Sequence, residues 1–228
     1  MIILLISIVL YLIEAHNHGI TMPDFEVYYK SAVRLLQGEN LYRIESDGFY
    51  VFKYAPASAI FFLPFTIVPF ALAKYLYWVF LTLVAMAAVY IVFDLSKPGL
   101  AQRKVSKFTT YVLLLVLSMG LHLYREFILG QVNIDLFLSY ILILILIQKD
   151  KPYLAGLFLA AGIMFKPWGI IFLPWLLLRK DYRIVLSFLL FTTLLFLLPV
   201  IFYGWQGLLE QNGKWLQQLI LEMENKKE

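Results

Sequence analysis

Polar side chains interrupt an otherwise apolar chain at a few places, and these are the positions where chemistry is possible. Asp24 follows Pro23 and opens a segment, residues 24–38, whose apolar positions recur with helical spacing up to Gly38. A carboxylate held at the start of a helix is able to accept a proton from a hydroxyl group. Aspartate is equally typical of a helix N-cap, and the two roles are compatible. We predict an amphipathic surface helix that carries a candidate general base.

A single lysine, Lys166, lies between two apolar stretches, residues 153–165 and 167–178. A lysine at mid-bilayer costs roughly 2.5–3.5 kcal/mol on insertion scales, which argues for a partner. One interpretation is that the ammonium group reaches the membrane interface. The other is that it binds an anionic group, such as a phosphate, as a point charge. The residue pattern leaves both interpretations open.

A polar break between two further apolar stretches supplies more candidates. Arg125 is followed by Glu126, and Gln131 and Asn133 come shortly after. The guanidinium of Arg125 suits a phosphate, and the amides of Gln131 and Asn133 suit sugar hydroxyl groups. The structural alternatives are an interfacial ion pair for Arg125 and interhelical hydrogen bonds for the amides.

The elements that must position these side chains are membrane helices. The 228-residue chain is 62% hydrophobic and 15% charged, whereas soluble domains have about 25% charged residues. Long apolar stretches alternate with short charged loops, which is the pattern of membrane proteins. We predict an all-α polytopic membrane protein with a single transmembrane domain over residues 1–228. The expected spans are residues 1–13, 72–93, 108–123, 132–148, 153–165, 167–178 and 184–203.

The longest polar segment, residues 14–70, is predicted to be a loop outside the membrane. Its stretch 55–70 is apolar but contains three prolines. A helix of this length rises about 24 Å, less than the hydrocarbon core of about 30 Å. We interpret residues 55–70 as an interfacial or re-entrant segment that does not cross.

Basic residues set the expected orientation. Loops 94–107, 149–152 and 179–183 hold nine Lys or Arg and three acids, whereas the rest of the chain holds ten Lys or Arg and twelve acids. Basic loops stay in the cytoplasm. We therefore predict a plasma (inner) membrane protein with its active face outside. That outer face gathers Asp24, Lys53, Arg125, Gln131, Asn133 and Lys166.

Several kinds of chemistry are disfavoured by composition. The chain has no cysteine, which excludes disulfides and thiol chemistry. No glycine-rich phosphate-binding loop is present, so nucleotide binding of the Rossmann or Walker type is not supported. His16 and His18 are a weak metal pair because no third ligand is obvious. We predict no metal, no cofactor and no nucleic-acid partner.

Four motifs occur in order along residues 24–183. They are Asp24-Phe25-Glu26-Val27-Tyr28-Tyr29 with Leu36-Gln37-Gly38-Glu39-Asn40-Leu41-Tyr42, Phe52-Lys53-Tyr54-Ala55-Pro56 with Leu63-Pro64-Phe65, Gly130-Gln131-Val132-Asn133, and Ala155-Gly156-Leu157 with Phe165-Lys166-Pro167. In this order, they resemble the motifs of glycosyltransferase family 87.

The resemblance implies a GT-C type transmembrane helix bundle whose outer first loop carries juxtamembrane helices. It implies a glycosyltransferase that moves a sugar, typically mannose, from a polyprenyl-phosphate carrier to a lipid or glycan acceptor, with inversion. The family's first-loop aspartate maps to Asp24 as the base, and its hairpin lysine maps to Lys166 as a contact for the carrier's phosphate. The other expected substrate-binding residues are Lys53, Tyr54, Arg125, Gln131 and Asn133. Because family members are usually longer, the chain is expected to match their N-terminal part.

Two other function classes stay open. Short apolar arms around Lys166 and Pro167 are also typical of a broken-helix binding site in a transporter or lipid-flipping protein. Against this interpretation, no second broken pair is evident in a matching half of the sequence. The third possibility is a truncated, non-catalytic remnant that stabilises another membrane protein.

Overall fold

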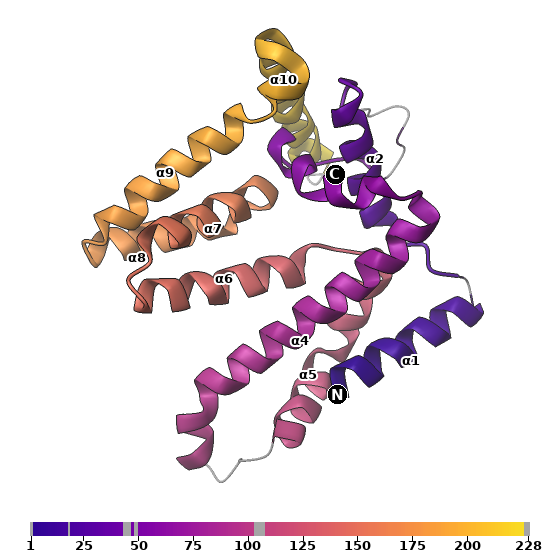
Figure 1. Cartoon of the computed structure of the whole chain (residues 1–228), viewed down its shortest axis with the longest axis vertical. Helices are drawn as coiled ribbons and strands as arrows, with labels where there is room; N and C mark the ends of the chain where they lie inside the picture. The colour runs from indigo at the N-terminus through magenta and orange to yellow at the C-terminus, as the bar shows by residue number, and fades with distance from the viewer. Residues whose placement is uncertain (1, 18, 43–46, 48–49, 103–107, 226–228) are drawn as a thin grey trace. The chain divides into compact units, whose positions relative to one another are not determined.

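The computed structural model describes residues 2–17, 19–42, 47, 50–102 and 108–225, and regular structure in these residues is entirely helical (Figure 1). The all-α prediction is therefore confirmed. His18 and residues 103–107 of the predicted loop 94–107 lie outside the described residues. The elements are α1 (Ile2–Asn17), α2 (Pro23–Leu36), η1 (Pro56–Ile67), α4 (Phe70–Gln102), α5 (Phe108–Leu129), α6 (Asn133–Gln148), α7 (Pro152–Phe165), η2 (Pro167–Ile171), α8 (Phe172–Leu178), α9 (Tyr182–Leu197) and α10 (Val200–Asn225).

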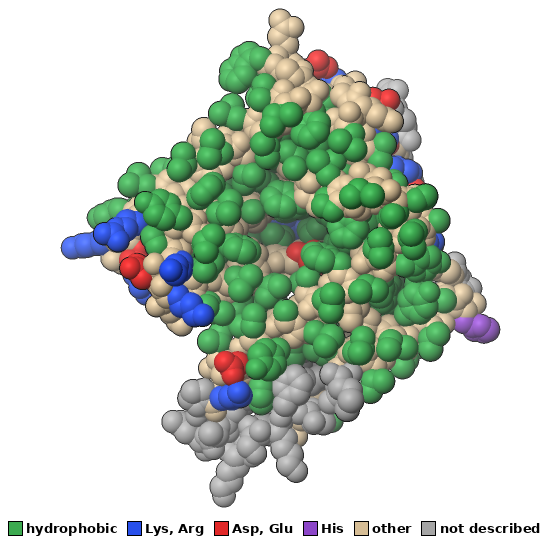
Figure 2. Space-filling view, viewed as in Figure 1, with side chains coloured by type: hydrophobic (Ala, Val, Ile, Leu, Met, Phe, Trp, Pro, Cys, Tyr) green, Lys and Arg blue, Asp and Glu red, His purple; other side chains and the backbone are tan. Residues whose placement is uncertain are grey.

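The helices present apolar surface outward, as a membrane protein requires. Hydrophobic side chains cover most of the face shown in Figure 2. Leu117, Leu178 and Ile201 are 82%, 84% and 72% exposed, respectively. Soluble monomers rarely expose contiguous apolar surface on this scale, whereas a bilayer covers it at no cost.

Helix length limits which segments cross a bilayer unaided. In the described part of the chain, only Phe70–Lys97 is long and apolar enough to do so as one helix. Two bent pairs each pass the same test when taken as one span, which gives up to three spans in all. These pairs are Leu117–Leu129 with Asn133–Gln148, bent by 114°, and Tyr182–Leu197 with Val200–Glu224, bent by 90°. The seven predicted spans lie on helices, and their crossing of the membrane stays a prediction.

Two helices extend beyond the boundaries expected from hydropathy. α1 continues to Asn17 instead of ending near residue 13, and α5 continues to Leu129 through most of the expected polar break. A change from apolar to polar residues marks the edge of a membrane but does not stop a helix. The actual stops are Gly19 and Gly130, which adopt φ angles of 72° and 69°. Glycine is the residue that tolerates this left-handed conformation.

The C-terminal region differs from the predicted span over residues 184–203. Residues 184–203 were expected to form one span, but α9 ends at Leu197 and α10 begins at Val200. Pro199 lies between them, and its missing N–H group and its ring prevent a continuous helix. The residues after 203, for which no span was predicted, are also helical, because α10 continues to Asn225 with a kink at Gly204.

Close packing divides the chain into two compact units. The first comprises Met1–Glu26 and Ala71–Ile141. In it, Trp78 of α4 donates a hydrogen bond from Nε1 to Ser7 Oγ of α1 at 2.9 Å. Ser7 Oγ also lies 2.6 Å from Thr82 Oγ1, and the Trp78 ring packs against Phe127 of α5 with centroids 5.1 Å apart. One tryptophan thus joins three helices.

The second unit comprises Val27–Phe70 and Leu142–Glu228. Figure 1 shows α7 and α9 side by side, and they are in extensive contact. Gly156 makes this approach possible, because a Cβ atom there would lie 2.6 Å from the backbone nitrogen of Phe188. The segment before η1 joins α7, since the Ala55 N–H donates to the Met164 carbonyl at 3.0 Å.

Candidate functional site

The candidate base lies in the first turn of α2. This helix buries Phe25, Tyr28 and Ala32 on one side and exposes Lys30, which confirms the predicted amphipathic helix. Because α2 begins at Pro23, Asp24 is not its N-cap, and that alternative is wrong. Proline favours the first helical position, which moves the helix start one residue earlier than expected.

The surroundings of Asp24 suit a negative charge. The carboxylate is half-buried and close to the N-terminus of a 14-residue helix, where the helix dipole stabilises anions. Met22, two residues before Asp24, has a φ of 48°, so the chain turns sharply into the helix. The backbone therefore holds this proton acceptor at a defined place.

The break between α5 and α6 packs directly against this turn within the first unit. A Cβ atom at Gly130 would lie 2.7 Å from Cβ of Phe25 and 3.1 Å from the terminal methyl of Met22. Gly130 also has a φ of 69°. Glycine is thus required here both for backbone conformation and for close approach. The structure brings together two motifs, around Asp24 and around Gly130, that are more than one hundred residues apart in the sequence.

Further contacts fix the start of α2 on α4. The Phe25 ring stacks on Tyr77 with centroids 4.1 Å apart and planes 8° apart. The Tyr77 hydroxyl in turn donates to Asp135 Oδ2 at 3.3 Å, and Lys74 Nζ donates to the Ile20 carbonyl at 2.7 Å. Sequence reasoning did not select Lys74 or Tyr77. Lys74 could have been selected from the sequence, because it is a lysine near the start of an apolar stretch and Lys166 was selected for a similar reason.

A hydrogen-bonded network spans the break. The amide nitrogen of Asn133 donates to Glu126 Oε1 at 2.6 Å and to Gln131 Oε1 at 2.7 Å. These bonds join α5 to the start of α6, as the structural alternative for the amides expected. Arg125 is exposed, whereas Glu126 accepts a hydrogen bond within the network. Contacts of Arg125, Gln131 and Asn133 with a substrate stay predictions.

In the second unit, the motif around Tyr54 meets the motif around Lys166. The Tyr54 ring makes an edge contact with Phe165, with centroids 5.6 Å apart. The half-buried Lys166 places Nζ 4.8 Å from the centre of the Trp168 ring. The backbone of Lys166 is extended and separates α7 from η2. Its side chain is therefore located at a break between two helices.

Two other contacts hold the Tyr54 segment. Lys53 Nζ pairs with Glu222 Oε1 of α10 at 2.9 Å, a partner that the sequence did not indicate. The Tyr42 hydroxyl donates to the Tyr54 carbonyl at 2.5 Å. Burial raises the pKa of the Tyr42 hydroxyl well above its ordinary value, so this group remains a neutral donor.

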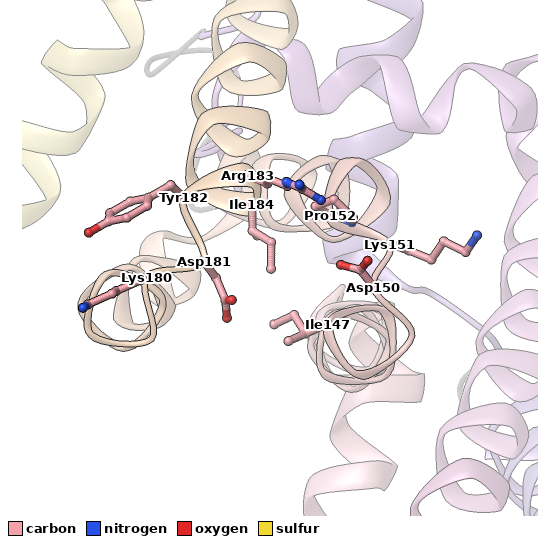
Figure 3. A pocket seen from close by; sticks show the side chains of 9 residues that line it. All are labelled: Ile147, Asp150, Lys151, Pro152, Lys180, Asp181, Tyr182, Arg183 and Ile184. Atoms are coloured by element: carbon pink, nitrogen blue, oxygen red, sulfur yellow. The ribbon is translucent and has the colours of Figure 1, made fainter.

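A hollow of about 350 Å³ lies elsewhere in the second unit, between the turns that precede α7 and α9 (Figure 3). Its lining has basic and acidic residues together, and Figure 3 shows Lys151 and Lys180 pointing away from Ile147 and in opposite directions. The mixed charge selects no ligand, and the hollow contains none of the predicted site residues. It is lined by Ile147, Asp150, Lys151, Pro152, Lys180, Asp181, Tyr182, Arg183 and Ile184.

The described residues contain no cluster of three or more His, Cys, Asp or Glu side chains arranged to hold a metal ion. Comparison with known proteins gives one family. The family model for glycosyltransferase family 87 matches residues 52–223. The match includes every predicted substrate-binding residue, and Asp24 precedes it. No curated protein and no solved structure matches the chain significantly.

Proposed function

The chain belongs to glycosyltransferase family 87, and we propose that it transfers a sugar from a polyprenyl-phosphate carrier to a lipid or glycan acceptor. Mannose is the expected sugar. The family and the apolar helices identify a membrane protein of a glycosyltransferase family. The carrier, the inverting course of the reaction and the outer face of the inner membrane as its location are parts of the proposal.

The observation that carries the proposal is the close contact between the turn of Asp24 and the break at Gly130. A Cβ atom at Gly130 would clash with Phe25, the residue after Asp24. The break supplies Gln131 and the amide of Asn133 beside it. The contact thus joins a segment with a half-buried carboxylate to a segment with hydrogen-bonding amides, and these groups together are able to orient and deprotonate a hydroxyl group.

The proposed reaction needs one proton acceptor and a good leaving group. An acceptor hydroxyl oxygen attacks the anomeric carbon of the donor sugar and forms the new C–O bond. Asp24 takes the hydroxyl proton as the bond forms. The bond between the anomeric carbon and the phosphate oxygen breaks, and the carrier phosphate leaves with the electron pair. Attack opposite the leaving group inverts the anomeric configuration.

Lys166 is the proposed contact for the departing phosphate. Its side chain is half-buried at a helix break, and an ammonium group there stabilises the negative charge that grows on the leaving group. Lys53 and Tyr54 belong to the same unit and are joined to its hairpin through Phe165 and Met164. These contacts support a donor role for this part of the chain.

The donor assignment is tested with the purified full chain in detergent micelles. Radiolabelled polyprenyl-phosphate-mannose and, separately, GDP-mannose are supplied with a lipid extract. We expect label to move to a new lipid-soluble or glycan product only from the polyprenyl carrier, with inverted configuration. Transfer from GDP-mannose alone, or retention of configuration, would overturn the proposed mechanism.

The role of Lys166 is tested by Lys166→Met, with Lys149→Met as a matched control on an exposed turn. Loss of a charged hydrogen bond to phosphate is worth about 1.5–3 kcal/mol, so we expect the KM for the donor to rise about tenfold or more in Lys166→Met. Equal kinetics of the two variants would remove Lys166 from the donor site.

A further inference from the structure

An apolar groove of about 420 Å³ lies in the first unit between α4, α5 and α6. Each helix contributes residues at helical spacing, so the groove runs along the helix faces and follows α5 for about 10 Å. Its lining residues are Ala85, Ala88, Val89, Met119, His122, Leu123, Glu126, Asn133, Ile134 and Phe137.

Small residues on α4 create the space. Ala85 and Ala88 are 5% and 2% exposed and form the floor, whereas Met119 and Phe137 are 47% and 51% exposed and form the rim. A volume in the range of a few hundred Å³ with a mainly apolar lining is typical of a site for an apolar ligand. Because the lining residues extend along the helix faces, the groove suits an alkyl chain.

The polar residues of the lining are confined to α5 and the start of α6. Glu126 and Asn133 are the two closest in sequence to the break at residues 130–132. The Asn133 amide hydrogens are directed to Glu126 and Gln131. What this end of the groove offers a ligand is therefore a carboxylate and an amide carbonyl, which are both hydrogen-bond acceptors.

This arrangement discriminates between head groups. None of the ten lining residues is a lysine or an arginine, and His122 is the one lining side chain that can become cationic. A phosphate placed beside Glu126 would meet a carboxylate, and like charges in a low-dielectric site repel strongly. A hydroxyl group would instead donate a hydrogen bond to the same carboxylate. The Glu126 carboxylate therefore favours a lipid whose head carries hydroxyl groups over a lipid whose head is a phosphate.

The polar end of the groove lies close in sequence to the break that packs against the turn of Asp24. Gln131 and Asn133 flank the break whose Gly130 abuts Phe25. A hydroxyl group held at Glu126 and Asn133 would therefore lie at the same break that contacts the turn of Asp24. We propose that the groove binds the alkyl chain of a hydroxyl-bearing acceptor lipid and directs its head toward Asp24. This inference rests on the proposed function and assigns its acceptor site.

The test uses binding alone, so that its failure differs from a failure of sugar transfer. The purified full chain in phosphatidylcholine nanodiscs is photolabelled with dodecyl glucoside that carries a diazirine at the chain end. Unlabelled dodecyl glucoside and dodecyl phosphate are compared as competitors, and labelled residues are mapped by mass spectrometry. We expect labelling of the groove, with competition by the glucoside and not by the phosphate.

Variants make the test specific. Ala88→Phe fills the groove, and displacing about two methylene groups of the probe lowers labelling by about tenfold. Leu83→Phe adds the same ring on the exposed side of α4 and is expected to leave labelling unchanged. Glu126→Gln removes the negative charge and should allow dodecyl phosphate to compete. If Ala88→Phe does not fold, Phe137→Ala removes a rim side chain, which is expected to reduce labelling of α6.

Two outcomes would overturn the proposal. The first is equal competition by dodecyl phosphate and dodecyl glucoside in the unaltered chain, which would make the groove a site for the carrier or for any amphiphile. The second is labelling that is spread over exposed helix faces and is unaffected by Ala88→Phe, which would mean bulk lipid only.

Discussion

Gly130 and Phe25 are so close that a single methyl group on Gly130 would lie 2.7 Å from Cβ of Phe25. We expect Gly130→Ala to destabilise the first unit through two costs. The left-handed φ costs about 1–2 kcal/mol for a residue with a Cβ atom, and overpacking adds about 1–3 kcal/mol. The measurement is the midpoint of thermal unfolding in detergent micelles.

Gly19→Ala is the matched control for this prediction. Gly19 has a similar φ of 72°, but a Cβ atom there would have no neighbour within 4 Å. It therefore carries only the conformational cost. Equal unfolding midpoints for the two variants would show that the contact between the break and the turn of Asp24 is absent.

A second pair of glycines tests the packing of α7 on α9. Gly156→Ala would place Cβ 2.6 Å from the Phe188 nitrogen, and backbone cannot move aside without separating the helices. Gly213 of α10 has open space around it, so Gly213→Ala should stabilise the helix by up to about 1 kcal/mol. We expect opposite shifts of the unfolding midpoint. Two shifts of the same sign would contradict this packing.

The ion pair between Lys53 and Glu222 allows a structural role of Lys53 to be distinguished from a role in substrate binding. Both side chains are partly exposed, at 48% and 25%, so breaking the pair should cost no more than about 1 kcal/mol of stability. If Lys53 contacts the donor, Lys53→Met raises the KM for the donor, whereas Glu222→Gln does not. Parallel kinetics of the two variants would assign Lys53 to structure alone.

The buried hydroxyl of Tyr42 should make the free energy of unfolding fall at alkaline pH. Burial raises the pKa of its hydroxyl above the ordinary value near 10. Below that value the group is protonated in both folded and unfolded chains, and its contribution is fully present. As the pH rises further, the unfolded chain loses the proton first, and stability falls by up to about 1.4 kcal/mol per pH unit.

Tyr42→Phe should therefore flatten the loss of stability above about pH 10, while it removes the hydrogen bond to Tyr54 at every pH. Unfolding by denaturant, followed at several pH values on both sides of this point, measures the slope. An unchanged slope in Tyr42→Phe would mean that another group controls the alkaline limb.

Hydropathy predicted where helices occur because the apolar stretches are long and uninterrupted. It did not predict where they end, since the stops at Gly19 and Gly130 depend on single left-handed residues. The break at Pro199 lies within an apolar stretch and gave no hydropathy signal. Helix α10 was missed because its buried face, which includes Leu208, Gln211 and Gln218, is partly polar.

The candidate site was predicted as residues but not as contacts. Motif order identified Asp24, Gln131 and Asn133, whereas the stacking of Phe25 on Tyr77 depends on tertiary packing between distant segments. Pairing preferences of this kind have no local sequence period. The groove was missed for a related reason, since Ala85 and Ala88 resemble any small residues of a membrane helix until their neighbours are known.

The most direct test of the account is sugar transfer by Asp24→Asn beside Glu26→Gln, with radiolabelled polyprenyl-phosphate-mannose as donor. Both variants remove one carboxylate from the first turn of α2, so they change the field of the helix equally. We expect Asp24→Asn to lose about 10²-fold or more in kcat, as loss of a general base does, while Glu26→Gln stays near the unaltered chain. Full transfer by Asp24→Asn, or equal losses in both variants, would contradict the assignment of Asp24 as the base.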